Sequence, residues 1–379
     1  MSGPRVRVAA VAAQAPSSPA FRIRVGLLRP ELALHGVEVD TYTLFSDAEG
    51  DRFYGGPLPT RMSVAIAARR RLERRLATIA TDVSVALVQR QVDVLPGLRL
   101  ERAAAAGRRL VWDVDDAIWF RHRVHAVTLA KGISRKAAWL AREADHVIVA
   151  NAVLAEHLGN VADAITIVPP TVETRDLPVR RHAAGPELVL GWIGSFSTAP
   201  YLASVRDVVA RIARELAPTP VRLLVVGGTT GPIAGAAVEC VPWALASERD
   251  ALGRIDVGLV PQPDTPWTRG KSAYKAIQYL AAGIPTVADD VGVVAATLGD
   301  GGVVVRDENE WVDALLWLAR DPELRQQLGA AGRRHAEREF SVARWAPVVA
   351  SVLRGDGAEP RTAARGTAGG AASAGARAR

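Results

Sequence analysis

The chain has 379 residues, 49% of them hydrophobic, with a formal net charge of +7 and a pI near 10.0. This length and apolar content suffice for two hydrophobic cores. The single cysteine, Cys240, excludes an internal disulfide and fits a reducing compartment. The sequence contains no signal-peptide pattern and no apolar run of about 18 residues, so we expect a cytoplasmic protein. The positive charge favours an anionic partner: a phosphorylated small molecule, an acidic membrane surface or a nucleic acid.

The first part of the chain alternates short apolar runs with longer helix-compatible segments. Several of the runs are apolar at consecutive positions, as in strands that are buried on both faces. The predicted strands are residues 6–14, 37–43, 83–89, 109–113, 146–150 and 165–169. Strands that alternate with helices predict a parallel sheet, and we assign residues 1–170 to an N-terminal Rossmann-like domain.

The same alternation restarts after a polar stretch that contains proline and arginine, which we assign as a linker over residues 171–187. Six further strands are predicted at residues 188–194, 221–227, 237–241, 255–261, 285–289 and 302–305. They predict a second Rossmann-like domain over residues 188–340, and thus an α/β chain with two doubly wound parallel sheets. Residues 355–379 are rich in Gly, Ala and Arg with almost no large apolar side chains, which predicts a disordered tail.

Ligands of open α/β sheets bind beyond the carboxyl ends of the strands, so two such domains facing each other predict a site in the cleft between them. The loop after the strand at 188–194 contains Gly194, Ser195, Ser197 and Thr198 ahead of a predicted helix. These residues fit an anion site of backbone N–H groups and hydroxyls, or simply a well-capped turn. The loop lacks the phosphate-binding P-loop pattern, and neither half shows a clean G-x-G-x-x-G after its first strand.

A second loop concentrates positive charge before a helix expected to begin near Ser272. Arg269 and Lys271 follow the strand at 255–261, and Lys275 lies one turn into the helix. Because a helix N-terminus already carries partial positive charge, these cations indicate a phosphate site, with a solvated surface as the alternative. We expect Lys275 to be solvated and Tyr279 to lie in the core.

Carboxylates follow the strand at 109–113. Asp113, Asp115 and Asp116 contain a D-x-D pattern, which can bind a metal, but we expect no metal and prefer acceptor-hydroxyl binding by Asp115 or Asp116, with helix capping as the alternative. The nearby His122 and His125 are interpreted as surface residues. After the first strand, Arg22 and Arg24 fit either contact with an anionic ligand or an exposed helix start.

Residues 62–80 predict an amphipathic helix with a basic face. Its arginines are Arg70, Arg71, Arg74 and Arg75. They fit solvation in water or docking on anionic lipid, which would make the protein peripheral on the inner face of the cell membrane. We expect no nucleic-acid partner, because no recognition motif accompanies the charge.

Several segments together resemble a known enzyme family over about residues 5–345. They are "GWIGSFSTAPYL", "LLVVGG", "DVGLVPQPDTPWTRGKSAYKAIQYLAAGIPTVADDVG" and "GGVVV", with "VWDVDDAIW" and "ADHVIVAN" in the first half. This set resembles family 4 glycosyltransferases of the GT-B fold, in a bacterial subgroup of unassigned acceptor.

The resemblance implies transfer of a sugar, with retention and without a metal or other cofactor, from a nucleoside-diphosphate sugar to a hydroxyl acceptor. The acceptor would be a sugar, a lipid-linked glycan or a small natural product, bound on the N-terminal domain. A helix over 341–354 would cross back to that domain. The donor would contact the C-terminal domain at Gly194, Ser195, Ser197, Thr198, Gly227, Gly228, Trp243, Trp267, Gly270, Lys271, Ser272, Gln278, Asp289 and Asp290.

The chain departs from the family in its charged residues. Two glutamates that members often carry at E-x7-E spacing correspond to Gly270 and Gln278, and a basic residue after the first strand of the second domain is absent. We therefore assign the catalytic roles to Lys271, Arg269, Asp115 and Asp116. A sugar-nucleotide epimerase of the same fold, a catalytically inactive sugar-nucleotide-binding protein and, from charge alone, a nucleic-acid-binding protein are the alternatives.

Overall fold

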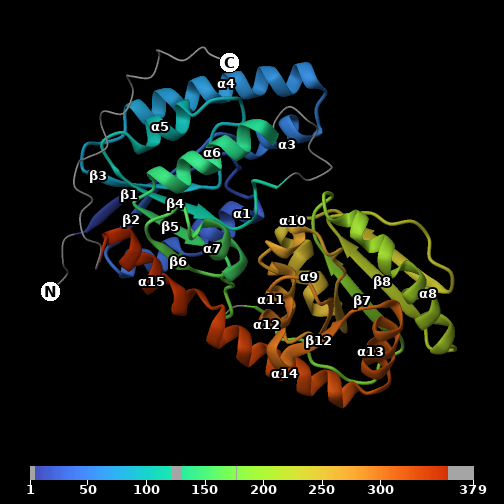
Figure 1. Ribbon diagram of the computed structural model, residues 1–379. Coiled ribbons are helices and arrows are strands. Elements are labelled where there is room, and N and C mark those ends of the chain that lie inside the picture. The colour runs from blue at the N-terminus through green and yellow to red at the C-terminus, as the bar shows by residue number, and fades with distance from the viewer. Residues whose placement is uncertain (1–4, 121–129, 176, 357–379) are drawn as a thin grey trace, which may run out of the picture.

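A computed structural model describes residues 5–120, 130–175 and 177–356, and these residues form two α/β domains (Figure 1). The N-terminal sheet has the strand order β2-β1-β3-β4-β5-β6, and all of its pairings are parallel. Its strands are β1 (Val6–Ala12), β2 (Val37–Thr43), β3 (Val83–Gln89), β4 (Arg109–Val114), β5 (His146–Val149) and β6 (Ile165–Ile167).

Both faces of this sheet are covered, because alternate side chains of a strand point to opposite faces and both sets are apolar here. Val8 and Ala10 of β1 join one buried cluster, whereas Ala9 and Val11 join the other. The helical segments of this part of the chain are α1 (Pro19–Phe21), η1 (Arg22–Gly26), α2 (Arg29–Leu34), α3 (Asp47–Gly55), α4 (Leu58–Ala77), α5 (Arg99–Ala105), α6 (Ala130–Glu143) and α7 (Ala152–Leu158).

The C-terminal sheet repeats this architecture with the strand order β12-β11-β10-β7-β8-β9, again with parallel pairings. Its strands are β7 (Leu188–Ile193), β8 (Val221–Val226), β9 (Ala236–Val241), β10 (Val257–Val260), β11 (Thr286–Asp289) and β12 (Gly302–Val305). Its helices are η2 (Ala199–Val205), α8 (Arg206–Glu215), α9 (Leu245–Arg254), α10 (Pro266–Arg269), α11 (Tyr274–Ala281), α12 (Val294–Leu298), η3 (Gly299–Gly301), α13 (Glu308–Arg320) and α14 (Pro322–Glu339). The expected pair of doubly wound parallel sheets is confirmed.

The last helix, α15 (Val342–Arg354), returns to the N-terminal domain, as the red ribbon in Figure 1 shows. Its Ala346 and Val349 belong to the same buried cluster as Val8 of β1. Arg109 donates from Nη1 to the carbonyl of Val352 at 2.6 Å. The helix is therefore part of the N-terminal core, although it follows the whole C-terminal domain in sequence. The exact domain boundaries drawn from the sequence stay predictions.

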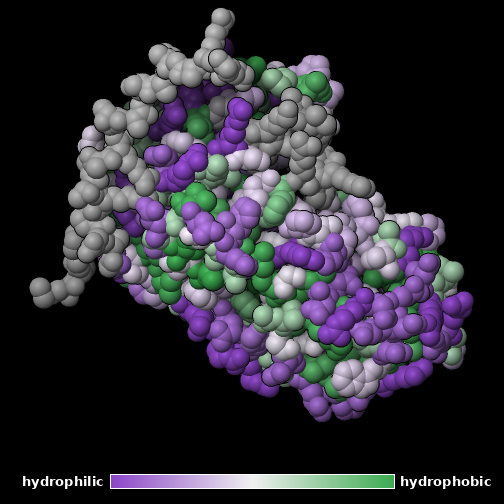
Figure 2. Space-filling model, viewed as in Figure 1, coloured by the Kyte–Doolittle hydropathy of each residue, from purple (hydrophilic) through white to green (hydrophobic). Residues whose placement is uncertain are grey.

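The helices of the described ranges are all too short or too polar to cross a membrane. In Figure 2 the lower surface of the C-terminal domain is largely hydrophilic, and hydrophobic side chains show at the right-hand end of α4 at the top of the N-terminal domain.

Candidate active site

The carboxyl ends of the two sheets meet where the domains touch, so the loops that follow strands from both domains line one site. Several side-chain contacts of the described residues cross between the domains there. They include Arg22 Nη2 to Glu248 Oε1 at 3.2 Å, Asn151 Nδ2 to the carbonyl of Gly270 at 3.1 Å, and Lys271 Nζ to Asp116 Oδ1 at 3.7 Å.

A cation without a carboxylate partner lies in this site. Lys275, in the first turn of α11, places Nζ 5.2 Å from the centroid of the Trp192 ring and 3.4 Å from Thr198 Oγ1. Among the residues that the structure describes, no carboxylate oxygen lies within 4.0 Å of Lys275 Nζ, so this ammonium forms no ion pair with them. Burial, helped by the neighbouring Lys271, lowers the pKa of Lys275 to about 7. An ammonium is costly to bury without a counter-charge, so this arrangement favours a bound anion. The expectation that Lys275 is solvated was wrong.

Lys271 supplies the second cation. Its Nζ lies 4.8 Å from the centroid of the Trp267 ring, and its carboxylate partner is Asp116 across the cleft. Asp116 is thus the one carboxylate of the described residues that lies near both lysines. Two ammonium groups against one carboxylate leave this part of the cleft positively charged.

The two predicted acceptor carboxylates have different surroundings. Asp115 is 7% exposed, receives two hydrogen bonds from the Arg90 guanidinium, and accepts from Gln89 Nε2 at 3.3 Å. Burial alone would raise the pKa of Asp115, but Arg90 outweighs it and holds that pKa below its usual range. Asp116 accepts from Arg90 Nη2 through Oδ2 at 2.8 Å and turns Oδ1 toward Lys271. Asp116 is therefore the carboxylate that remains available to a ligand.

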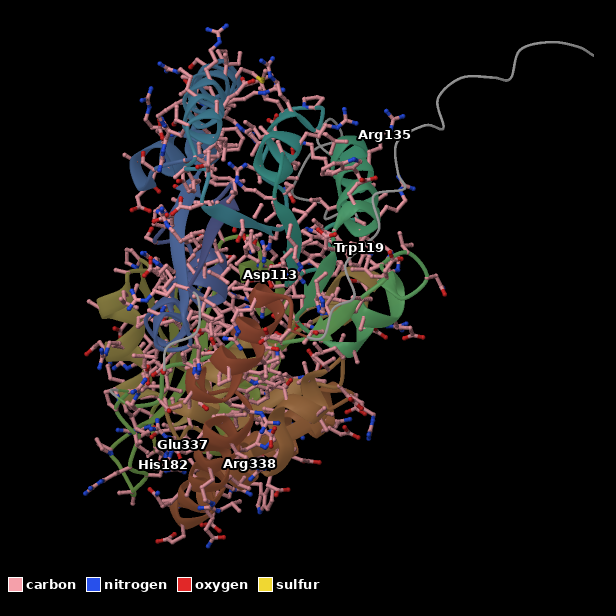
Figure 3. All side chains as sticks on the ribbon, turned by 90° about the vertical axis from the view of Figure 1, so that its left-hand side faces the viewer. Asp113, Trp119, Arg135, His182, Glu337 and Arg338 are labelled. Atoms are coloured by element: carbon pink, nitrogen blue, oxygen red, sulfur yellow. The ribbon has the colours of Figure 1, made fainter. Side chains whose placement is uncertain are left out.

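Arg24 and Asp113 form a buried ion pair beneath the site. Arg24 donates from Nε to both oxygens of Asp113, at 3.2 and 3.1 Å, and from Nη1 to the carbonyl of Val168 at 2.6 Å. Both residues are 5% exposed or less, and Figure 3 shows Asp113 near the middle of the molecule. The sequence interpretations of Arg24 as a cleft-edge cation or an exposed helix start were wrong, because its guanidinium satisfies a buried carboxylate.

The loop after β10 differs from the expectation of one helix that begins near Ser272. Thr265 caps a short helix, α10, by accepting from the Thr268 amide, and Pro266 occupies its first turn. The chain then reaches α11 through Ala273, whose φ of +51° is left-handed. Thr followed by Pro is a common helix start, and this pattern was overlooked.

The three cations therefore lie on different segments, with Arg269 in α10, Lys271 in the connecting turn and Lys275 in α11. Arg269 ends α10, its side chain is 60% exposed, and it pairs with Asp264 through Nε at 2.6 Å and Nη2 at 2.8 Å. The catalytic role predicted for Arg269 stays a prediction. The surroundings expected of Arg269, a cation next to backbone and hydroxyl groups of the cleft, are found at Lys275 instead.

A cavity of about 750 Å³ opens beside the loop after β7. Three predicted donor residues, Gly227, Gly228 and Trp243, line it together with Phe196, which is 62% exposed. Gly227 has a φ of +78°, and a Cβ there would lie 2.1 Å from the carbonyl oxygen of Gly194. Only glycine therefore lets the β7 and β8 loops approach this closely.

The hydroxyl residues after β7 lie between this cavity and the lysines. Ser195 Oγ and Ser197 Oγ lie 2.8 Å apart, and Thr198 carries the oxygen next to Lys275. Three further predicted donor residues belong to the segment around α10 and α11. Trp267 and Ser272 are half-buried and Gln278 is buried.

Asp289 and Asp290 line a second cavity, of about 610 Å³, at the ends of β10, β11 and β12. Asp289 accepts from the amide of Gln262 at 2.6 Å and from Trp311 Nε1 at 2.8 Å, so its carboxylate already has protein partners. Asp290 lies 3.4 Å from Arg306 Nε. Their predicted contacts with the donor sugar stay predictions.

Within residues 5–120, 130–175 and 177–356, no three His, Cys, Asp or Glu side chains gather as a metal site would need. His122 and His125 lie outside the described residues. Sequence reasoning missed Arg90, Asn151, Phe196 and the role of Lys275. For Lys275 a usable indication was its place near the start of the predicted helix after β10, because such a helix start lies close to the carboxyl edge of the sheet.

Comparisons with known proteins identify what the chain is similar to. Residues 187–321 match the family described as "Glycosyl transferases group 1". The match lies within the C-terminal half of the chain and spans most of the C-terminal domain. This domain holds Lys271, Lys275 and the cavity next to Trp243.

Solved structures establish the fold over most of the chain. The chain matches the sucrose-phosphate synthase of Thermosynechococcus elongatus with a TM-score of 0.66 and 16% identity, over 92% of this chain and 98% of the other. It matches Anabaena HepE, in complex with UDP-glucose, with a TM-score of 0.62 and 12% identity, over 92% and 100%. The fold is GT-B, and the predicted fold is thereby confirmed.

Curated relatives cover less of the chain. The D-inositol 3-phosphate glycosyltransferase of Stackebrandtia nassauensis is 30% identical over 207 residues, 46% of this chain and 45% of the relative. The corresponding protein of Nocardia farcinica is 30% identical over 228 residues, 51% and 49%. The chain thus spans about half the length of the curated relatives that it matches. The resemblance to family 4 glycosyltransferases is supported at the level of fold and C-terminal domain.

Proposed function

We propose that the protein is a glycosyltransferase that moves a sugar from a nucleoside-diphosphate sugar to a hydroxyl acceptor. The observation that carries this proposal is Lys275, a half-buried ammonium without a carboxylate partner in the described chain, beside Lys271 at the carboxyl end of a parallel sheet. A diphosphate is the anion that best fits two neighbouring cations with serine and threonine hydroxyls next to them.

The chemistry required of these residues is modest. As the bond between the sugar C1 and the phosphate oxygen breaks, negative charge builds up on the leaving diphosphate. Fixed ammonium groups stabilise that charge and need no reorganisation during the reaction. Lys271 and Lys275 supply this stabilisation in the proposal, so the reaction needs no metal. We further propose retention of configuration, on the basis of the family resemblance.

The nucleoside fits the cavity next to Phe196 and Trp243. The cavity volume of about 750 Å³ is in the range of small-molecule sites, and its aromatic and glycine lining suits a flat base. Neighbouring structures of the same fold, such as Anabaena HepE, are complexes with UDP-glucose. They support a nucleotide-sugar donor but leave the base of this donor open.

A panel of UDP-, GDP- and dTDP-sugars tests the proposal. Slow release of the nucleoside diphosphate from at least one donor is expected, and Lys271→Ala should reduce it strongly. An epimerase would instead change the sugar with the nucleotide still attached, and an inactive binding protein would be stabilised thermally without turnover. If no nucleotide stabilises or reacts, the proposal is wrong.

We also propose that the outer face of α4 docks on an anionic membrane. Of its predicted arginines, Arg71 pairs with Glu49, and Arg75 donates to the carbonyl of Thr41 at 3.3 Å. Arg70 and Arg74 are exposed and form no ion pair with a carboxylate in the described chain.

The same helix exposes an apolar stripe that the sequence analysis did not single out. Leu58, Met62 and Ile66 are 69%, 43% and 40% exposed at four-residue spacing. Apolar side chains followed by unpaired arginines are typical of helices that lie in the surface of anionic bilayers.

Flotation with vesicles tests the docking proposal. The protein should float with vesicles that contain phosphatidylserine and not with pure phosphatidylcholine. The double variant Arg70→Glu/Arg74→Glu should abolish flotation, whereas Arg214→Glu/Arg320→Glu on the C-terminal domain should not. Equal flotation of both double variants would contradict the proposal.

A further inference from the structure

Arg90 has a strained backbone at the carboxyl end of β3. Its φ is +55°, a left-handed value that is unfavourable for a residue other than glycine. The surroundings hold it in place, because its amide donates to the carbonyl of Asp113 at 2.7 Å and its carbonyl accepts from Trp112 Nε1 at 2.7 Å. A strained residue that its neighbours fix this firmly indicates a positioning role.

The group that Arg90 positions is Asp116. Through Nη2 it donates at 2.8 Å both to Asp115 Oδ2 and to Asp116 Oδ2. Asp115 thus serves as a buried counter-charge for Arg90, and Asp116 has one oxygen fixed and the other, Oδ1, directed to Lys271 on the opposite domain.

The loop of the C-terminal domain that carries Lys271 comes close to the N-terminal domain at Gly270. A Cβ on Gly270 would lie 2.6 Å from Ala117 Cβ, a distance at which the backbones would have to move apart. Asn151 Nδ2 donates to the carbonyls of Gly270 and Lys271 at 3.1 and 3.3 Å, which ties the loop to the N-terminal domain. The loop therefore offers no side chain at position 270, and the carboxylate nearest to Lys271 comes from the other domain.

We propose that Asp116 holds a hydroxyl of the donor sugar, with Arg90 as its positioning residue, and that the close contact of Gly270 with Ala117 brings it there. This inference rests on the proposed function. In a nucleotide sugar the sugar is attached directly to the outer phosphate. If Lys271 binds that phosphate, a carboxylate oxygen 3.7 Å from its Nζ faces the attached sugar. Asp116 Oδ1 has an ion-pair partner but accepts no hydrogen bond from the described residues, so it can accept one from a sugar hydroxyl. The inference differs from the sequence prediction, which gave Asp115 or Asp116 to the acceptor.

Equilibrium binding tests the role of Asp116 without an acceptor. The probes are UDP, GDP and dTDP, each compared with its glucose, galactose and mannose esters. For the donor that the hydrolysis panel identifies, Asp116→Asn should reduce the preference for the sugar ester over the bare diphosphate by about 10-fold to 100-fold. The bare diphosphate itself should bind equally well or more tightly, because a negative charge next to Lys271 has been removed. A purely structural role would weaken both ligands together. The matched control is Asp313→Asn on α13, which should change neither.

The results separate the two proposals. A wild-type chain that binds no nucleoside diphosphate refutes the proposed function. A chain that binds the diphosphate, but in which Asp116→Asn leaves the preference for the sugar ester unchanged, overturns this inference alone.

The contact at Gly270 has its own test. Gly270→Ala should remove the preference for the sugar ester, and the compensating Ala117→Gly in the same chain should restore it. Gly253→Ala on α9, where a Cβ meets no atom within 4 Å, is the control. If Gly270→Ala binds both ligands like the wild type, the close contact is not needed, and the inference fails on that point.

Discussion

Replacing Lys275 by methionine should make the protein more stable and at the same time remove its nucleotide binding. Methionine keeps the length of the aliphatic side chain under Trp192 but carries no charge that must be desolvated. The pKa of Lys275 falls from its usual 10.5 to about 7, and each pKa unit corresponds to about 1.4 kcal/mol. The full difference is about 5 kcal/mol, and partial contact of the side chain with solvent reduces the expected gain to about 1–3 kcal/mol.

The pH dependence of this gain follows from proton binding. Between about pH 7 and pH 10.5 the unfolded chain keeps the proton of Lys275, whereas the folded protein has released it. The free energy of unfolding of the wild type therefore rises with pH across this window. The advantage of Lys275→Met is largest at pH 7 and below, and it fades as the pH approaches 10.5.

Urea unfolding at pH 7 and pH 9.5, with calorimetric titration of UDP and GDP, measures both effects. Lys136→Met is the matched control, because Lys136 donates to the carbonyl of Leu95 at 2.7 Å and lies 3.7 Å from Glu101, so its loss should destabilise the protein. A Lys275→Met variant that is less stable than the wild type at both pH values would refute the argument from burial. A variant that binds nucleotide like the wild type would refute the position of the phosphate site.

Four further outcomes are expected. Lys271→Ala should lower donor turnover by about 10-fold to 100-fold, while Arg74→Ala should stay within about twofold, and equal effects in a hydrolysis assay would contradict the assigned phosphate site. Arg24→Met should cost about 3–5 kcal/mol of unfolding free energy in urea, because it leaves Asp113 buried without a partner, and a cost below about 1 kcal/mol would contradict the buried pair. Phe196→Ala should weaken UDP or GDP binding and leave pyrophosphate binding unchanged in calorimetry, whereas a parallel loss of both would mean that Phe196 does not contact the base. Treatment with EDTA should leave donor turnover within about twofold, because lysine ammonium groups supply the positive charge in the proposal.

The sequence was sufficient to predict the two sheets. Strands such as β3 and β8 are apolar at consecutive positions, and this pattern depends only on burial at both faces. The position of Lys271 was predictable for a related reason, because a loop after a parallel strand must lie at the carboxyl edge of the sheet.

The pairing of charges was not predictable, because it depends on contacts between distant segments. Arg24 and Asp113 are 89 positions apart and neutralise each other in the core. Arg90 donates to both Asp115 and Asp116, but only Asp116 keeps an oxygen that faces the cleft. No spacing in the sequence indicates this difference.

The reason for Gly270 was not predictable either, because it also depends on a contact between distant segments. Its missing side chain looked like a lost functional group in the sequence, and only the nearness of Ala117 gives it a steric reason. Lys275 was misjudged because the short helix α10 was overlooked, and with it the turn that carries the chain from Arg269 to α11.

A crystal structure of the protein with UDP or GDP tests the central claim most directly. The account predicts that the diphosphate lies within hydrogen-bond distance of the Nζ atoms of Lys271 and Lys275, with the base in the cavity beside Phe196 and Trp243. A diphosphate bound elsewhere, for example at the exposed guanidinium of Arg269 with both lysines unoccupied, would contradict it.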